Sequence, residues 1–208
     1  MSLAEVWERI SEKLLSRVDR VTHTRERKAA KLRTSRRARP GRIVLVCYGN
    51  ICRSPYAAAY LRRRLAEDGI KGVDVDSAGL IGPGRPANRQ GAAIALERGL
   101  DLSGHRSRLF LASDSGRADL VLVMTRRQRE QLVNEFGVPV ERIELLGDFD
   151  AEDPPFREIA DPYGKSDEVF TRVFLQIERC VDGLCACWTE QAPKCVDERS
   201  VTLDDSTS

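Results

Sequence analysis

The sequence has no apolar run approaching the roughly 18–20 residues that a membrane-spanning helix needs. Its first residues, MSLAEVWERISEK, mix acidic and basic side chains and lack the apolar stretch of a signal peptide. No internal repeat is visible, and 41% of the 208 residues are hydrophobic, which is enough to bury a core. These features exclude transmembrane, collagen-like, coiled-coil-array and wholly disordered proteins, and they predict one compact domain with extensions.

Cysteine is too sparse for a disulfide scaffold, because only six thiols are spread over the chain and only Cys47 and Cys52 share a tight motif. Since no export signal is visible, we expect a reducing, cytoplasmic location. The remaining thiols are irregularly spaced with no histidine nearby, unlike the ligands of a structural zinc site. We therefore predict no metal and interpret these four as buried or adventitious thiols: Cys180, Cys185, Cys187 and Cys195.

Charge is unevenly distributed, with a net charge of +7 over residues 1–40 and −5 over the remaining chain. An apolar stripe at intervals of three or four predicts an amphipathic helix over 3–21, preferably packed on the body of the protein. Residues 25–42 hold nine basic side chains and one acid and are interpreted as a solvated linker. Because residues 25–42 lack the aromatic side chains on which bases stack, we predict no nucleic-acid partner, and an anionic or protein partner for residues 1–40 stays open.

Strand-like and helix-like patterns alternate after residue 41. We predict strands over 42–47, 73–77, 119–124 and 142–146, and helices over 55–68, over 88–98, up to residue 136, and from 166 toward 184. Strands separated by helices predict an α/β protein with a four-stranded parallel sheet covered on both faces. The polar residues near the C-terminus predict a loose tail. The expected divisions are 1–40, 41–186 and 187–208.

The first predicted strand runs directly into the sequence CYGNICRSP and then into a helix. Ligands of parallel α/β sheets bind where the strands end, and such a loop can direct successive backbone N–H groups at an anion. Gly49 and Asn50 tolerate the left-handed backbone that the loop requires. Arg53 offers a planar fork for two phosphoryl oxygens, and Ser54 can donate a hydrogen bond to a Cys47 thiolate. The motif predicts a nucleophile held inside an oxyanion receptor.

Cleavage of a phosphoester also needs an acid to protonate the leaving oxygen. Asp161 is the preferred candidate, because Pro162 biases its backbone toward an extended conformation that projects the carboxylate. Asp153 is a rival on the same argument, whereas Asp148 and Asp150 are interpreted as solvated loop charges. No Walker A motif is present, and the two prolines in GPGRPA, residues 82–87, indicate a loop and not a dinucleotide-binding turn.

Together, CYGNICRSP and the Asp-Pro-Tyr segment resemble the low-molecular-weight protein-tyrosine phosphatase family over about residues 41–186. The resemblance implies a three-layer α/β sandwich and a metal- and cofactor-independent phosphatase acting on phosphorylated proteins. It implies that Cys47 is the nucleophile, Arg53 the phosphate clamp and Asp161 the acid and then the base. The backbone of residues 48–53 would bind the phosphoryl oxygens. The residues that would bind the substrate or its phosphate are Tyr48, Gly49, Asn50, Ile51, Cys52, Ser54 and Tyr163.

The same resemblance assigns a supporting hydrogen-bond network to Asn50, Ser54, Ser77 and His105. It also makes Cys52 a partner of Cys47 in a reversible disulfide that protects the nucleophile from over-oxidation.

One departure concerns the substrate slot. Family members acting on phosphotyrosine usually have an aromatic wall after the DSAG segment, where this chain has LIGPGRPAN. Tyr163 and Tyr48 are then the side chains left to stack on a phenyl ring. Ile51 resembles tyrosine-directed members, since related arginine phosphatases tend to have threonine there, so we expect phosphotyrosine as substrate.

Two other functions remain open from the sequence. A thiol-dependent arsenate reductase of the same fold needs two further cysteines after the second helix, and residues 100–118 contain none. Its nearest spare thiols are Cys180, Cys185 and Cys187, on or after the last predicted helix. A non-catalytic module that binds anions or phosphoproteins is the second alternative, against which the joint presence of Cys47, Arg53 and Asp161 argues.

Overall fold

The computed structural model describes residues 23–152, 154 and 156–189. Four strands form one sheet in the order β2-β1-β3-β4, and every neighbouring pair is parallel. They are β1 (Arg42–Cys47), β2 (Asp74–Gly79), β3 (Leu120–Val123) and β4 (Ile143–Leu145). The predicted four-stranded parallel sheet is therefore confirmed, with each strand within three residues of its expected bounds.

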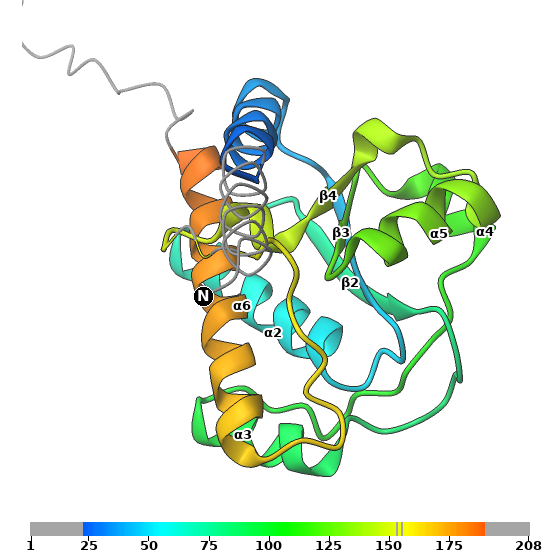
Figure 1. Cartoon of the computed structure of the whole chain (residues 1–208), viewed down its shortest axis with the longest axis vertical. Helices are drawn as coiled ribbons and strands as arrows, with labels where there is room; N and C mark the ends of the chain where they lie inside the picture. Colours follow the sequence, from blue (N-terminus) through cyan, green and yellow to red (C-terminus); the bar gives the residue numbers. More distant parts are fainter. Residues whose placement is uncertain (1–22, 153, 155, 190–208) are drawn as a thin grey trace, which may run out of the picture.

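Helices cover both faces of this sheet (Figure 1). Side chains of β1 alternate between two hydrophobic clusters: Ile43 and Leu45 face one, and Val44 and Val46 face the other. The first cluster lies beneath α2 (Arg53–Glu67), α3 (Arg89–Glu97) and α6 (Asp167–Thr189), and the second beneath α5 (Arg126–Phe136). Because both faces are buried, β1 requires a continuous apolar sequence. The arrangement is a three-layer α/β sandwich.

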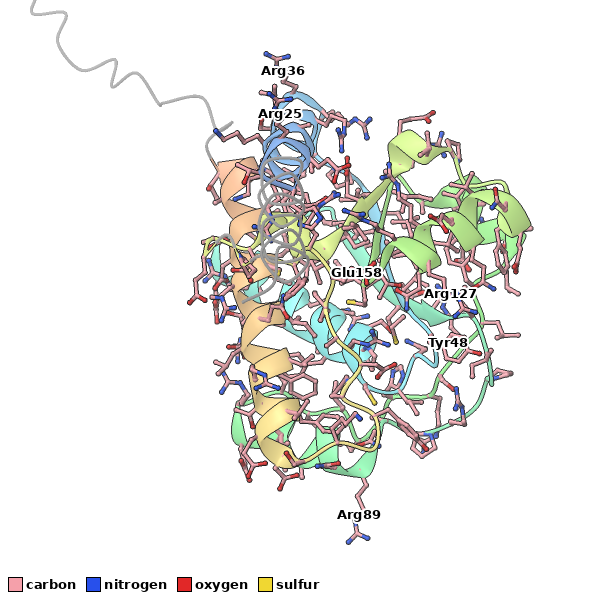
Figure 2. All side chains as sticks on the ribbon, in the orientation of Figure 1. Arg25, Arg36, Tyr48, Arg89, Arg127 and Glu158 are labelled. Atoms are coloured by element: carbon pink, nitrogen blue, oxygen red, sulfur yellow. The ribbon has the colours of Figure 1, made fainter. Side chains whose placement is uncertain are left out.

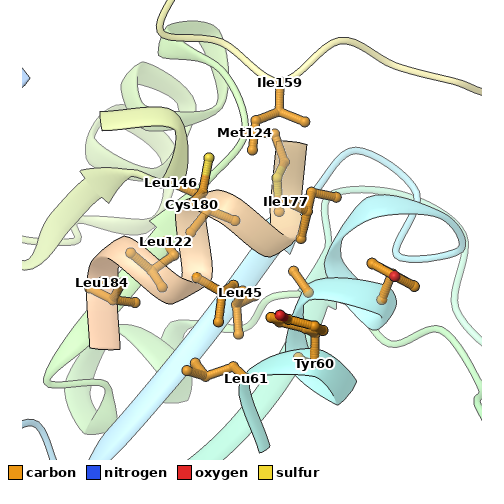
Figure 3. Packing of buried hydrophobic residues seen from close by; sticks show 14 of the residues in the cluster. Leu45, Tyr60, Leu61, Leu122, Met124, Leu146, Ile159, Ile177, Cys180 and Leu184 are labelled. Carbon is orange, nitrogen blue, oxygen red and sulfur yellow. The ribbon is translucent and has the colours of Figure 1, made fainter. Parts of the chain in front are cut away.

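The longest helix, α6, continues to Thr189, beyond the predicted end near residue 184. Its last turns are held by burial, since Cys185 and Trp188 are almost completely inaccessible to solvent. Figure 3 shows Ile177, Cys180 and Leu184 of this helix packed over the sheet. The interpretation of Cys180, Cys185 and Cys187 as buried thiols is confirmed, whereas Cys195 lies outside the described residues.

The structure differs from the prediction in the basic stretch before β1. Residues 23–36 are helical and do not form a solvated linker. Arg27, Ala30 and Thr34 lie on one face of this helix and are buried against the domain. Arg33 donates a forked pair of hydrogen bonds, 2.8 and 2.7 Å, to the carboxylate of Glu144 on β4. Acidic partners on the body thus compensate basic side chains that the sequence pattern placed in solvent. The predicted helix over 3–21 and the tail beyond residue 189 lie outside the described residues.

Two acids that were expected to be solvated are buried. Asp148, in the 3-10 turn η2 (Leu146–Phe149), and Asp150 are each 1% exposed. Asp148 pairs with Arg157 and Asp150 with Arg179, so both charges are compensated across the chain and not by water. A short helix that the sequence did not predict, α4 (Ala112–Arg117), precedes β3. Of the helices that the structure describes, none is both long and apolar enough to cross a bilayer.

Candidate active site

The CYGNICRSP loop lies at the carboxyl end of the central strand β1, with Cys47 as the last strand residue and Arg53 as the first residue of α2. Asn50 has φ of 52° and is the one non-glycine residue in the described chain with a left-handed backbone. Of the two residues expected to adopt it, Gly49 does not. The end of β2 passes so close that a Cβ on Gly79 would meet the backbone nitrogen of Asn50 at 2.9 Å. The loop is therefore tightly held in its turn.

Two donors face the sulfur of Cys47, which is 2% exposed. The backbone N–H of Asn50 lies 3.2 Å from Sγ, and the hydroxyl Oγ of Ser54 lies 3.0 Å from it. Ser54 Oγ is also 3.4 Å from the carbonyl oxygen of Ala78, a longer and weaker alternative for its proton. Hydrogen bonds to an ionised acceptor are stronger than those between neutral groups. Both donors consequently favour the thiolate, which is the reactive form of cysteine.

Asn50 joins the predicted supporting residues into one buried network. Its Nδ2 donates to Ser54 Oγ at 3.0 Å and to Ser77 Oγ at 2.9 Å, and its Oδ1 accepts from the backbone N–H of Arg108 at 2.9 Å. Nε2 of His105 lies 2.6 Å from the Asn50 carbonyl oxygen, which can only accept. Burial lowers the pKa of His105 and so favours the neutral ring, and the contact with the carbonyl oxygen requires a proton on Nε2.

Arg53 and Asp161 meet on the other side of the loop. The Arg53 guanidinium is 3% exposed, with Nη1 donating to the Ile159 carbonyl oxygen at 3.0 Å and Nη2 paired with the Asp161 carboxylate. Nε of Arg53 is buried with no hydrogen-bond partner among the described residues. Asp161 itself is about half exposed and accepts from the backbone N–H of Tyr163 at 3.1 Å. The fold thus brings the predicted clamp and acid together, whereas Asp153 lies outside the described residues.

A cavity of about 310 Å³ opens above the Cys47 sulfur. Its inner lining includes Arg53 and Asp161, and its rim carries the exposed rings of Tyr48 and Tyr163. This geometry accommodates a phosphate at the base of the cavity and an aryl group between the two tyrosines.

Sequence reasoning did not identify the residues that line the cavity after the DSAG segment, where family members acting on phosphotyrosine usually have an aromatic side chain. Ile81 and Arg85 line that side of the cavity. The predicted loop around residues 82–87 is present, and Arg85 Nη2 donates to the carbonyl oxygens of Gly49, at 2.8 Å, and Ile81, at 3.0 Å. No sequence signal marks Arg85, because its partners are backbone atoms that only the folded chain brings near it.

Cys52 also lines the cavity, but its chemistry differs from that of Cys47. Burial raises the pKa of Cys52 to about 12, so it is a neutral thiol near neutral pH. Cys47 and Cys52 are both unpaired thiols in this structure. Burial similarly raises the pKa of Cys185 to about 12, and Cys185 is not among the residues that line the cavity. Cys180, also on α6, is likewise absent from the cavity lining. Neither thiol is therefore well placed to exchange with Cys47, as an arsenate reductase would require.

A buried thiol faced by two donors, at the end of a central parallel strand and beside an arginine and a carboxylate, defines a cysteine-dependent phosphatase on a three-layer α/β fold. Residues 42–194 match the family described as low molecular weight phosphotyrosine protein phosphatase. The chain belongs to this family and is a hydrolase. The basic helix over residues 23–36 lies before the matched region.

Curated and structural relatives agree with this assignment. A probable low molecular weight protein-tyrosine-phosphatase, EpsP of Ralstonia nicotianae, is 37% identical over 141 residues, or 67% of this chain and 90% of that protein. The tyrosine phosphatase AmsI of Erwinia amylovora superposes with a TM-score of 0.65 at 29% identity, over 73% of this chain and 95% of its own. The YwlE arginine phosphatase of Geobacillus stearothermophilus superposes with a TM-score of 0.63 at 32% identity, over 72% and 94%.

Proposed function

We propose that this protein hydrolyses phosphotyrosine in protein substrates, with Cys47 as nucleophile, Arg53 as phosphate clamp and Asp161 as acid and base. The observation that carries the proposal is the cavity of about 310 Å³ in which these three groups converge beneath Tyr48 and Tyr163. In this proposal residues 41–186 form the catalytic domain, flanked by 1–40 and 187–208. Cys47 must stay a free thiol to act as nucleophile, so we propose a reducing compartment such as the cytoplasm.

In the first step, the phosphate dianion replaces Asp161 as the partner of Arg53, and the backbone N–H groups of the loop bind its oxygens. The Cys47 thiolate attacks phosphorus in line, forming the S–P bond as the P–O bond to tyrosine breaks. Asp161, released from Arg53, takes up a proton from solvent and gives it to the departing phenolic oxygen. The products of this step are tyrosine and a phosphocysteine.

In the second step, the Asp161 carboxylate takes a proton from a water molecule that attacks the phosphorus. The S–P bond breaks and its electron pair returns to Cys47. The Ser54 hydroxyl and the Asn50 N–H, which lie 3.0 and 3.2 Å from Sγ, stabilise the thiolate as it leaves. Release of inorganic phosphate, together with return of the Asp161 proton to solvent as the carboxylate pairs again with Arg53, restores the starting enzyme.

The choice of phosphotyrosine rests on the walls of the cavity. Tyr163 is 63% exposed and Tyr48 is 51% exposed, so both rings are free to stack on a substrate ring. Ile51 supports the same choice, because related arginine phosphatases tend to have threonine at this loop position. Phosphoarginine is the competing substrate, since an arginine phosphatase is among the structural relatives.

The proposal is tested by steady-state hydrolysis of p-nitrophenyl phosphate, a phosphotyrosine peptide and a phosphoarginine peptide, each in the presence of a metal chelator. We expect the wild type to hydrolyse the first two, Cys47→Ser to be inactive, and Asp161→Asn to lose about 10²–10⁴-fold on the peptide. Glu97→Gln, which removes an exposed carboxylate from α3, is the matched control and should behave as wild type.

Each other outcome contradicts a separate part of the proposal. Hydrolysis of the phosphoarginine peptide alone would exclude the tyrosine specificity while leaving the thiol chemistry intact. Turnover of arsenate that depends on thioredoxin and is lost in Cys180→Ser would indicate a reductase. A wild type that binds phosphate but hydrolyses none of the three substrates would be an anion-binding module.

A further inference from the structure

We propose that the helix over residues 23–36 positions the general acid, and that Arg27 is the positioning residue through which it acts on the acid loop, defined here as residues 156–161. The inference rests on the proposed role of Asp161. It assigns a role to a helix that precedes the region matching the family, residues 42–194.

Two neighbouring side chains of the helix contact the start of the acid loop. The Arg27 guanidinium is buried, and its Nη2 donates to the carbonyl oxygens of Pro154, at 2.6 Å, and Phe156, at 3.1 Å. The carboxylate of Glu26 forms an ion pair with Arg157, the next residue of the loop. The helix therefore holds both the backbone and a side chain at the point where the loop begins.

The acid loop depends on these contacts because it lacks regular structure. Within residues 156–161 it makes one hydrogen bond between backbone groups, from Ile159 N to the Met124 carbonyl oxygen at 3.0 Å. The Ile159 carbonyl oxygen accepts from Arg53 Nη1, also at 3.0 Å. Asp161 follows two residues later. Besides its direct contacts with Arg53 and the Tyr163 N–H, the position of its carboxyl group consequently depends on an anchor at 156–157, to which the helix contributes, and an anchor at 159, supplied by the sheet and the clamp.

Arg157 ties the anchor at 156–157 to the core. Besides Glu26, its guanidinium forks onto the carboxylate of Asp148, and both side chains are nearly inaccessible to solvent. A planar arginine fork fixes direction as well as distance, so the loop cannot slide along the domain without breaking this pair. Nearby, the Glu158 carboxylate accepts from the Arg126 backbone N–H at 2.8 Å, at the start of α5.

The helix is itself fastened to the domain and does not need the loop to stay in place. Ala30 is fully buried in the main core cluster, and Thr34 is 6% exposed on the same face. Arg33 forms its forked pair with Glu144 on β4. Removing Arg27 should therefore release the loop while leaving the helix docked. Placement matters for proton transfer, because misplacement of a catalytic group by about 1 Å can cost on the order of 10²-fold in rate.

The test compares kcat/KM on aryl phosphates whose leaving groups differ in basicity. A basic phenolate from phenyl phosphate needs the proton of Asp161, whereas 2,4-dinitrophenolate leaves without it. In Arg27→Ala we expect a loss of about tenfold or more on phenyl phosphate and less than about twofold on 2,4-dinitrophenyl phosphate. Arg36→Ala is the matched control: this exposed arginine of the same helix extends away from the body (Figure 2), and neither rate should change.

A double variant separates positioning from general stability. If Arg27 acts through Asp161, Arg27→Ala adds no further loss on phenyl phosphate when Asp161→Asn is already present. Equal losses on both substrates, or no loss on either, would overturn the inference. If Asp161→Asn itself shows no dependence on the leaving group, the proposed acid is wrong, which is a separate failure. Glu26→Gln, at the exposed edge of the cluster, provides the same comparison if Arg27→Ala does not fold.

Discussion

Replacing Ser54 with alanine isolates one contact of the nucleophile. The variant removes a hydroxyl that lies 3.0 Å from Cys47 Sγ in a fully buried position. A hydrogen bond to a charged group contributes about 1.5–3 kcal/mol, which corresponds to about 10- to 150-fold in rate. The thiolate gains this stabilisation as it leaves the phosphocysteine, so the loss falls on the second step. The first step, which consumes the thiolate, is affected less.

We therefore expect Ser54→Ala to lower kcat on p-nitrophenyl phosphate by about 10- to 150-fold and to accumulate the phosphocysteine. Stopped-flow measurement should show a burst of p-nitrophenolate approaching one per active site, followed by slow turnover. Ser113→Ala, which removes an exposed hydroxyl on α4, is the control and should show neither effect. An unchanged kcat, or a lower kcat without a burst, would refute the reasoning that Ser54 stabilises the leaving thiolate.

Two further predictions concern stability. In Gly147→Ala the new Cβ would lie 1.9 Å from the Arg157 carbonyl oxygen, so we expect a loss of about 1–3 kcal/mol or more in the free energy of unfolding. Gly116→Ala, where no atom lies within 4 Å, should instead be neutral or stabilising in urea unfolding, and equal stability of the two variants would contradict the close approach. Burial lowers the pKa of His105 below its ordinary value of 6.5, so the unfolded chain takes up a proton first as the pH falls. This contribution to stability is complete above pH 6.5 and is lost as the pH falls through the lowered pKa. Between about pH 7 and about pH 5, the free energy of unfolding measured in urea should therefore decrease less in His105→Asn than in the wild type. An identical decrease in the two proteins would exclude His105 as the cause.

The basic helix over residues 23–36 contacts the acid loop, although it precedes the region that matches the family. In the matched region the strands, the thiol loop and the Asp-Pro-Tyr segment place Cys47, Arg53 and Asp161 at one cavity. Residues 23–36 add a buried arginine and an acid that contact the backbone and side chain at residues 156–157. In our proposal, the general acid is thus positioned partly by a segment more than 100 residues away in sequence.

Much of the fold could be predicted from the sequence because the relevant signals are local. The apolar runs of β1 and β3 indicate strands buried on both faces, and the residues flanking them indicate where helices begin and end. The nucleophile, its clamp and its donor lie within eight residues, so the loop that joins them is itself a local structure. The same holds for Asn50, whose left-handed backbone follows from its residue type and place in the turn.

Contacts between distant segments were decided only by the tertiary structure. Nothing local distinguishes Asp148 or Arg27 from a solvated charge, since each is buried together with a partner that the sequence pattern does not reveal. Arg157, the partner of Asp148, lies nine residues away across a loop, and Pro154, a partner of Arg27, lies 127 residues away. Arg85 became a wall of the cavity through carbonyl oxygens that no pattern of side chains reveals. Sequence alone therefore determined the chemistry at the end of β1, and the tertiary structure decided what surrounds it, because burial and charge compensation depend on residues that are neighbours only in space.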